Sequence, residues 1–302
     1  IVTPVGRRVD EASPMVDARL PDGSRVNVVI PPISLVGTSM TIRRFGRRRM
    51  DSRDLLGGGA LDARMLEFLR LCVLHRRSLL VSGGTGSGKT TLLNVLSSMI
   101  PREERVVTIE DSAELAFDHP NLVSLETRTR NIEGRGEVSV RDLVRNALRM
   151  RPDRIVVGEC RGGETIDMLQ AMNTGHDGSL TTVHANSPRE LLSRLEVMVL
   201  MSGVELPIVA IREQIAASIQ GIVHQARFAC GTRRITRITE VTGVAAGTIQ
   251  LQDLFRFIPD APARGGGSRG SHIACGHVPQ FYERLAGEGH VLDPGLFTED
   301  LQ

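Results

Sequence analysis

The sequence predicts an α/β protein in which a small, mostly β domain precedes a larger domain built on a parallel sheet. Three observations predict this fold class. Short apolar runs, typical of buried strands, alternate with helix-like segments between residues 79 and 201. The run at residues 79–81 leads directly into a glycine-rich loop and then into a helix-like segment. Near the start of the chain, apolar and polar residues alternate on both sides of Pro21-Asp22-Gly23, which is typical of a β-hairpin.

The composition argues against some classes of protein. The chain has 302 residues, enough for one large domain or two ordinary ones with a real hydrophobic core. A formal net charge of +2 gives no global field that would attract nucleic acid. The lack of tryptophan and the single tyrosine, Tyr282, leave few aromatic surfaces for stacking bases. We therefore expect no nucleic-acid partner.

The cysteine spacing and the lengths of the apolar runs favour a cytoplasmic protein. Four cysteines without C-x-x-C spacing predict reduced thiols in a cytoplasmic protein rather than a disulfide or zinc framework. They are Cys72, Cys160, Cys230 and Cys275. No uncharged apolar run approaches membrane-spanning length and no signal peptide opens the chain, so no transmembrane segment is expected. Because the chain begins at Ile1 and residues 7–30 read like the interior of a domain, we expect an N-terminal part to be absent.

The N-terminal region is predicted to be a partial domain over residues 1–54, followed by a linker over residues 55–60. The hairpin strands are residues 15–20 and 25–30, and residues 39–45 are a third strand candidate. Three consecutive glycines in the linker make it a candidate hinge between the two domains.

The glycine-rich loop fits the pattern G-x-x-x-x-G-K-[ST]. A phosphate chain needs many backbone N–H donors aimed at one point, and glycine lets the backbone fold that tightly. Lys89, the only lysine in the chain, would bring a mobile charge to the outer phosphates, and the Thr90 hydroxyl would bind Mg²⁺. The residues assigned to nucleotide binding are Gly83, Gly84, Thr85, Gly86, Ser87, Gly88, Lys89, Thr90 and Thr91.

Acidic residues stand at the ends of two predicted strands. Glu110 and Asp111 follow the strand at residues 105–109, with Glu114 beyond them, and Glu159 ends the apolar run RIVVGE. Ligands bind at the carboxyl ends of strands in an open parallel sheet, so these carboxylates are expected to face the Mg²⁺–phosphate site. Capping of a following turn is the alternative. Glu159 has the position of a Walker B acid that orients or deprotonates the attacking water.

The sequence leaves open the roles of the arginines and histidines near these strands. Arg128, Arg130 and Arg135 lie on a loop without apolar periodicity, where they either stabilise phosphate charge, within a subunit or from a neighbour, or are solvated. For the cluster at residues 47–49, composition alone favours a solvated face. His176 and His184 bracket the strand at residues 179–183, which favours a phosphate-sensing role for one of them. Two histidines alone do not support a metal site.

The remaining elements follow from periodicity and from helix start signals. Helices are predicted over residues 61–76, 92–99, 140–150, 164–172, 188–201, 207–219 and 280–286, and further strands over residues 122–125, 222–228, 234–241 and 248–254. Ser187, Pro188 and Glu190 read as an N-cap, a first-turn proline and a capping-box acid. A flexible stretch is expected at about residues 264–272, within a C-terminal extension of the large domain, which spans residues 61–302.

Four blocks stand in order along the chain: GGTGSGKTT, TIEDSAEL, RPDRIVVGECRGGET and TGHDGSLTTVHAN. Together they resemble the type II/IV secretion-system ATPases, specifically the CpaF/TadA branch that powers tight-adherence (Flp-type) pili. The loop TRTRNIEGRGEVSVRDLVRNALRMRPD and the segment MVDARLPDGSRVNVVIPPIS resemble the same branch. A phosphate loop alone is generic, whereas the set of four blocks is specific. The resemblance covers essentially the whole chain and is weakest after about residue 265.

The resemblance implies a RecA-like P-loop ATPase domain, a smaller N-terminal domain joined by a linker, and a hexameric ring. It implies that Glu110, Asp111 and Glu114 form an Asp box, with Glu159 as the Walker B acid. It implies that His176 and His184 are the His-box residues. The arginines implied to contact phosphates within or across subunits are Arg43, Arg44, Arg128 and Arg130. Cys160 stands where the family usually has valine, which we interpret as a buried swap of similar size.

The implied reaction is ATP hydrolysis with Mg²⁺. Thr90 would bind the metal directly, while Glu110 and Glu159 would hold its waters and the attacking water. Glu159 is the expected base, with Glu110 as the alternative. Hydrolysis would remove the γ-phosphate contacts of Lys89, His184 and the arginines, and let the two domains rock about the glycine linker.

The resemblance also implies partners and a location. A ring of this kind would act on inner-membrane platform proteins of a pilus or secretion system, from the inner face of the cytoplasmic membrane. Two alternatives remain open. One is a nucleic-acid motor of the same RecA-like fold, and the other is a nucleotide-gated regulator that hydrolyses negligibly.

Overall fold

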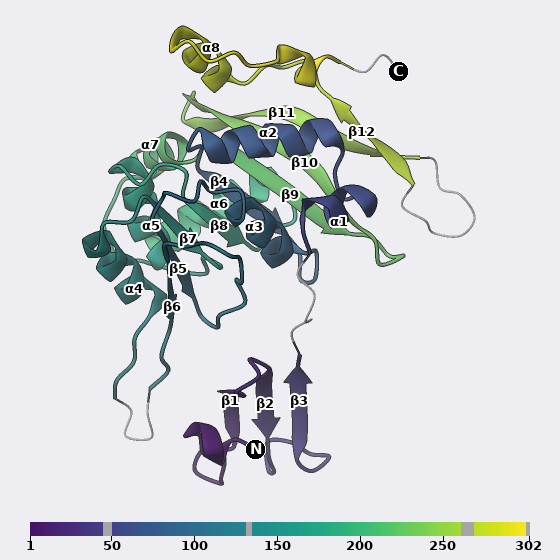
Figure 1. Cartoon of the computed structure of the whole chain (residues 1–302). Coiled ribbons are helices and arrows are strands. Elements are labelled where there is room, and N and C mark those ends of the chain that lie inside the picture. Colours follow the sequence, from purple (N-terminus) through teal and green to yellow (C-terminus); the bar gives the residue numbers. More distant parts are fainter. Residues whose placement is uncertain (45–49, 131–134, 261–268, 300–302) are drawn as a thin grey trace. The chain divides into compact units, whose positions relative to one another are not determined.

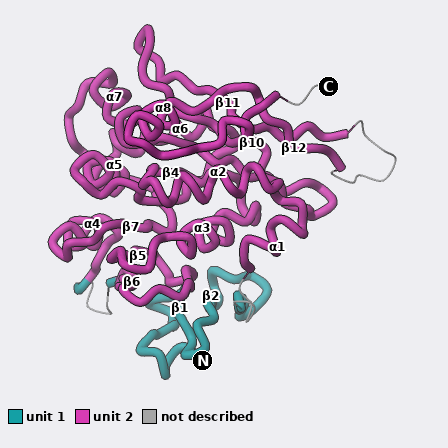
Figure 2. The backbone as a smooth tube through the Cα atoms, turned by 45° about the horizontal axis from the view of Figure 1, so that its top comes forward, with its two compact units in different colours: residues 1–49, 130–136 teal, residues 50–129, 137–302 magenta. Residues whose placement is uncertain are grey.

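The computed structural model describes residues 1–302 except 45–49, 131–134, 261–268 and 300–302 (Figure 1). The chain forms two compact units, coloured separately in Figure 2. The smaller unit comprises residues 1–49 and 130–136, and the larger unit comprises residues 50–129 and 137–302. The arginine cluster at residues 47–49 and part of the arginine-bearing loop lie outside the described residues.

The smaller unit is an antiparallel sheet of three strands, preceded by a 3-10 helix at Thr3–Val5. The strands are β1 (Met15–Arg19), β2 (Arg25–Val29) and β3 (Ser39–Arg43). The turn between β1 and β2 forms because Asp22 accepts the N–H of Ser24 at 2.9 Å and Gly23 takes a positive φ of 86°. Val26 and Val28 are buried in its small core. The predicted hairpin and third strand are thus confirmed.

The larger unit is built on a nine-stranded mixed sheet of order β12-β11-β10-β9-β4-β8-β7-β5-β6. Strands β9, β4, β8, β7, β5 and β6 are parallel, and β9 to β12 are antiparallel neighbours. The strands are β4 (Leu79–Gly83), β5 (Val106–Glu110), β6 (Leu122–Glu126), β7 (Arg154–Val157), β8 (Leu180–Val183), β9 (Gly221–Arg227), β10 (Arg233–Ala245), β11 (Thr248–Pro259) and β12 (Gly270–Ala274).

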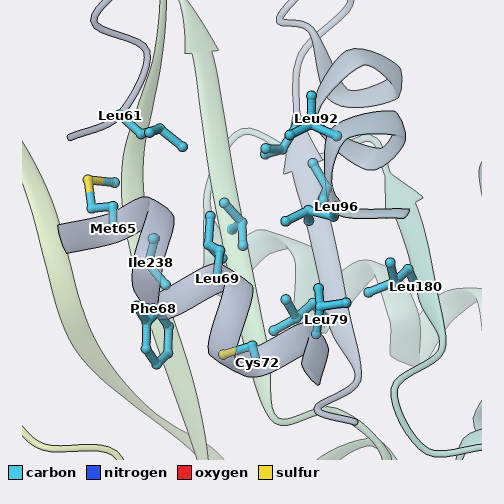
Figure 3. Close-up of a cluster of buried hydrophobic side chains, with 14 of the residues drawn as sticks. Leu61, Met65, Phe68, Leu69, Cys72, Leu79, Leu92, Leu96, Leu180 and Ile238 are labelled. Carbon is cyan, nitrogen blue, oxygen red and sulfur yellow. The ribbon is translucent and has the colours of Figure 1, made fainter. Parts of the chain in front are cut away.

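Helices cover both faces of this sheet. They are α1 (Ser52–Gly57), α2 (Ala63–Leu74), α3 (Lys89–Ser97), α4 (Val140–Ala147), α5 (Glu164–Asn173), α6 (Pro188–Leu200), α7 (Ile208–Ser218) and α8 (Gln280–Gly287), with 3-10 turns at Leu148–Met150 and Pro294–Phe297. Successive residues of a strand point to opposite faces, and on β4 Leu79 and Val81 join one buried cluster while Leu80 joins the other. Figure 3 shows the first cluster, where Leu69 of α2 and Leu96 of α3 pack beside Leu79.

The residues of the predicted linker lie in the larger unit. Residues 55–60 contribute Leu55 and Ala60 to the core of the larger unit, where they are 4% and 7% exposed. Asp51 begins α1 with a capping box to Asp54, so the helix that precedes the glycines is anchored at its start. Residues 55–60 therefore belong to the larger unit, and their role as a hinge stays a prediction.

The C-terminal part of the chain packs on α2. Ala274 of β12 is fully buried beside Phe255 of β11, so residues 270–272 of the stretch expected to be flexible belong to an edge strand instead. Beyond it, Phe281 of α8 and Phe297 lie against the ring of Phe68, with centroids 6.1 and 5.4 Å away. No helix in the described part of the chain has both the length and the apolar character needed to cross a bilayer.

Candidate nucleotide-binding and hydrolysis site

The glycine-rich loop joins the end of β4 to the start of α3 and needs glycine at three positions. Gly83, Gly86 and Gly88 have φ angles of 154°, 70° and 101°, which residues with a Cβ rarely adopt. At Gly83 a Cβ would also collide with the carbonyl oxygen of Gln225 and the hydroxyl of Ser87. The loop can therefore fold tightly enough to aim backbone N–H groups and the N-terminus of α3 at one point.

Lys89 is the first residue of α3, and its side chain folds back over the loop. Its ammonium group donates to the carbonyl oxygen of Gly84 at 3.1 Å. Burial lowers the pKa of Lys89, the carboxylate of Glu159 opposes this shift, and the guanidinium of Arg161 adds to it. A bound anion would favour the charged form of Lys89, since it offers the ammonium group a full negative charge instead of a carbonyl dipole. Thr90 follows on the same helical turn and is half-buried.

Glu110 ends β5 and is almost fully enclosed, with 4% of its surface exposed. Its Oε1 accepts the backbone N–H groups of Glu114 and Leu115, both at 2.9 Å. Burial raises the pKa of Glu110, and these two hydrogen bonds oppose the shift. The alternative of turn capping is therefore part of what Glu110 does. Gly158 at the end of β7 allows this packing, because a Cβ there would stand 2.9 Å from the Glu110 side chain.

Glu159 lies two residues beyond β7 and is held by an arginine that the sequence did not single out. Arg161 donates to Oε2 of Glu159 from Nη2 at 2.7 Å and from Nε at 3.0 Å. Its Nη1 lies 3.5 Å from Oδ2 of Asp111, so one guanidinium links acids from the ends of two strands. The hydrogen bond to Glu159 is the main cause that raises the pKa of Arg161. Glu159 keeps 27% of its side chain exposed, so water can reach it.

The sheet topology brings the predicted groups to one edge. Strands β4, β8, β7 and β5 are parallel neighbours, so the segments that follow them leave the same edge of the sheet. The phosphate loop follows β4, His184 follows β8, Glu159 follows β7 and Glu110 ends β5. The structure therefore gathers four elements of the predicted site in consecutive strand positions.

The two predicted histidines lie at opposite ends of β8. His184 directly follows the strand and is half-buried at the edge that carries the phosphate loop. His176 precedes the strand, and its backbone N–H and its Nδ1 lie 3.2 and 3.3 Å from the carbonyl oxygen of Ala171 at the end of α5. Because β8 runs parallel to β4, His176 is at the edge of the sheet away from the loop. Within this chain the structure does not bring His176 to the candidate site.

A third histidine, which the sequence did not single out, contacts the residue that precedes the phosphate loop. His224 on β9 is 7% exposed, and its Nδ1 lies 2.8 Å from the hydroxyl of Ser82, the residue before the loop. Burial lowers the pKa of His224 to about 4, and the positive charge of Arg237 contributes. A neutral imidazole therefore holds the end of β4 at physiological pH. No local pattern in the sequence marks His224, because its role depends on the pairing of β9 with β4.

The predicted phosphate-binding arginines are divided between the two units. Arg43 ends β3 and Arg44 follows it, both exposed in the smaller unit, which also includes Arg130. Arg128 belongs to the larger unit, where its backbone exchanges hydrogen bonds with Val138 at 3.0 and 2.8 Å. Their contact with a nucleotide stays a prediction.

The oxygen donors at this edge fit a magnesium ion that arrives with a nucleotide. Among the described residues, no group of three or more His, Cys, Asp or Glu side chains is arranged to hold a metal ion. Mg²⁺ in nucleotide sites is usually held by one or two carboxylates or hydroxyls together with the phosphates, not by a protein cage. The hydroxyl of Thr90 and the carboxylates of Glu110 and Glu159 are donors of the right chemistry for that arrangement.

The fold and the loop define the class of protein: the larger unit is a RecA-like P-loop ATPase fold, with a smaller antiparallel sheet as its N-terminal companion. Residues 2–252 match the family described as type II/IV secretion system protein. This match covers most of the sequence, so the chain belongs to that family.

Curated relatives come from several organisms. The chain is 44% identical over 251 residues to a putative conjugal transfer protein of Mycobacterium tuberculosis, a match that covers 81% of this chain and 70% of the relative. It is 46% identical over 208 residues to the type IV secretion system protein PtlH of Bordetella pertussis, which covers 61% of each chain. It is 34% identical over 256 residues to the conjugal transfer protein TrbB of Rhizobium radiobacter, which covers 83% of this chain and 75% of the relative.

Two solved structures share the fold. The crystal structure of the VirB11 ATPase from the Brucella suis type IV secretion system, in complex with sulphate, is 32% identical with a TM-score of 0.53, covering 79% of this chain and 80% of that one. The pilus retraction motor PilT with bound ADP is 26% identical with a TM-score of 0.55, covering 80% of this chain and 64% of that one. The relatives thus include secretion, conjugation and pilus proteins, and they do not single out the tight-adherence branch.

Proposed function

We propose that this chain binds Mg²⁺ and ATP at the β4–α3 loop and hydrolyses the β–γ phosphate bond. The observation that carries the proposal is the gathering of Lys89, Glu159 and Glu110 at one edge of the parallel strands, where Glu110 ends β5, Glu159 follows β7 and the loop of Lys89 follows β4. The loop N–H groups and the start of α3 would hold the phosphates, and Lys89 would exchange its bond to Gly84 for one to phosphate. Mg²⁺ would neutralise charge that develops on the phosphate oxygens.

The two acids have different surroundings, which supports different roles. Glu159 is open to water, and both guanidinium bonds go to its Oε2, so Oε1 is the oxygen available to take a proton from the attacking water. Glu110 is enclosed and already accepts two backbone N–H groups, so it suits orientation of a metal-bound water rather than proton transfer. We therefore assign the base role to Glu159.

At the level of the assembly, we propose a homo-oligomeric ring, most simply a hexamer, that turns hydrolysis into mechanical work for a pilus or a type II/IV secretion system. Family membership supports this proposal. The ring would act on platform proteins at the inner face of the cytoplasmic membrane. Within the family, the tight-adherence pilus branch is the subtype that the sequence blocks favour.

The proposal is tested by steady-state phosphate release with Mg²⁺ and ATP, measured against protein concentration and paired with the mass from light scattering. We expect turnover per subunit to rise with concentration as a ring forms. A chain that binds ATP but releases no phosphate at any concentration would instead be a nucleotide-gated regulator. Turnover that depends on added nucleic acid would indicate a nucleic-acid motor.

A further inference from the structure

Strand β9 lies beside the phosphate loop, on the side away from the acidic residues. In the sheet, β4 lies between β8 and β9, and the strands that carry Glu159 and Glu110 are on the β8 side. On the other side β9 runs parallel to β4, with Gly83 opposite Gln225. Strand β9 continues into β10, and this β9–β10 hairpin is not used by the hydrolytic groups described above.

Gln225 has a side chain that is buried against the loop and incompletely satisfied. It is 2% exposed, and its Oε1 has no hydrogen-bond partner in the described structure. Its Nε2 lies 3.1 Å from the position of a Cβ on Gly88, the residue that precedes α3. The hydroxyl of Ser87, in the loop itself, is also buried and has no hydrogen-bond partner among the described residues. Buried polar groups are nearly always paired, so two unpaired ones at one loop point to a ligand that completes them.

Two arginines of the hairpin lie beside the loop, and one of them donates a hydrogen bond to it. Arg233 donates from Nε to the carbonyl oxygen of Gly86 at 2.8 Å. This bond draws a carbonyl dipole towards the hairpin, where it would not oppose phosphate oxygens. Nη1 of Arg227 lies 3.5 Å from the position of a Cβ on the same glycine. Two guanidinium groups therefore add positive charge beside the loop.

We propose that Gln225 is a nucleotide-binding residue and that Arg233 positions the loop for it, so that the β9–β10 hairpin grips the part of the nucleotide common to ATP and ADP. The inference rests on the proposed function. A carboxamide can present its N–H to a phosphate oxygen or its oxygen to a ligand hydroxyl or a metal-bound water. The acids on the β8 side act on the γ-phosphate, so loss of Gln225 affects binding of both nucleotides rather than the hydrolytic step.

The test compares Gln225, within β9, with Gln220, the residue that precedes β9. Gln225→Met keeps the volume and removes the polar atoms, while Gln220→Met does the same at the opposite edge, where Oε1 of Gln220 accepts the N–H of Ser78 at 2.8 Å. Binding of Mg²⁺–ADP is measured by calorimetry, KM for ATP by phosphate release, and Tm without nucleotide by thermal unfolding. For Gln225→Met we expect Kd and KM to rise about ten-fold with no drop in Tm.

For Gln220→Met we expect the reverse pattern, a lower Tm with Kd unchanged, because it loses a satisfied hydrogen bond far from the loop. Gln225→Met with Kd for ADP within two-fold of the wild type overturns the proposal. If that variant fails to fold, the proposal is tested by two variants at exposed positions of β10, Arg233→Gln beside the loop and Arg237→Gln as its control. Equal ADP affinity in these two variants overturns the proposal. A wild-type chain that does not bind ADP refutes the proposed function itself, which separates the two failures.

Discussion

Arg161 holds Glu159 through two hydrogen bonds to a single oxygen, Oε2, at 2.7 and 3.0 Å. The same guanidinium reaches Asp111 at 3.5 Å, so it joins the ends of β7 and β5. The backbone N–H of Arg161 is itself anchored, since it donates to Oε1 of Glu164 at 2.6 Å at the start of α5. The orientation of the proposed base thus depends on a residue two positions along the chain.

Replacement of the proposed base should separate binding from hydrolysis. Glu159→Gln keeps the shape of the side chain but cannot accept a proton, so we expect turnover to fall by about 10²- to 10⁴-fold while ATP affinity changes little. Phosphate release and calorimetry measure the two effects. Glu164→Gln is the matched control, because a carboxamide oxygen at this position can still accept the N–H groups of Arg161 and Gly162. If Glu110→Gln abolishes turnover and Glu159→Gln does not, the base is Glu110.

Removal of the only lysine should abolish nucleotide turnover. Lys89→Ala deletes the mobile positive charge that would leave Gly84 for the phosphates, and we expect ATP affinity to fall by about ten- to a hundred-fold. Thermal unfolding without nucleotide should be close to that of the wild type, since among the described residues the side chain donates only to its own loop. Wild-type turnover in this variant would contradict the assignment of the loop as the nucleotide site.

The buried Glu110 should make stability depend on pH with a definite sign. Its pKa is raised in the folded state, so the folded chain holds this proton more tightly than the unfolded chain does. Stability from this group is therefore present at low pH and is lost as pH rises above 4.5 through the folded pKa. We expect Glu110→Gln to raise Tm relative to the wild type more at pH 8 than at pH 4. An equal difference at both pH values would contradict the shift.

His224 should make stability depend on pH with the opposite sign to Glu110. Its folded pKa of about 4 lies below the ordinary value of 6.5, so stability is fully present above pH 6.5 and falls as the pH drops towards 4. The loss can reach about 3 kcal/mol. His224→Asn, which keeps a polar partner for Ser82, should lose less stability than the wild type between pH 7.5 and pH 5 in chemical denaturation. If the free energy of unfolding of the wild type and of the variant falls by the same amount over this pH range, the depressed pKa of His224 is contradicted.

The C-terminal aromatic cluster should contribute strongly to stability. Phe297 is 1% exposed and meets the rings of Phe68, Phe255 and Tyr282. We expect Phe297→Ala to lower the free energy of unfolding by about 3–5 kcal/mol, measured by denaturant titration. Val291→Ala, at a fully exposed position in the same tail, should change it by less than about 0.5 kcal/mol. Equal effects would mean that the tail does not pack as described.

The central strands and the phosphate loop could be predicted from the sequence because their signals are local. Strands buried on both faces read as continuous apolar runs, as at residues 79–81 and 155–157. The tight loop needs glycine at fixed positions, so the requirement is written in consecutive residues. Strand β12 gave no such signal, since Gly270 and Ser271 open it and its pairing with β11 comes from the fold.

The site residues that could not be predicted from the sequence reach the site through contacts between distant parts of the chain. Ser82 and His224 are 142 positions apart and meet only because β9 lies beside β4. Gln225 and Arg233 reach the loop for the same reason. His176 shows the converse, because proximity in sequence to His184 does not place it at the same edge once a strand runs between them.

The distribution of thiols makes the β9–β10 turn accessible to spectroscopy. Cys72 and Cys160 are buried, and burial raises the pKa of Cys160 to about 12, so neither should react readily with maleimides. Cys230 is exposed in that turn, three residues before Arg233. With the half-buried Cys275 replaced by serine, a fluorophore or spin label on Cys230 would report, in real time, whether the turn moves as the neighbouring loop fills and empties.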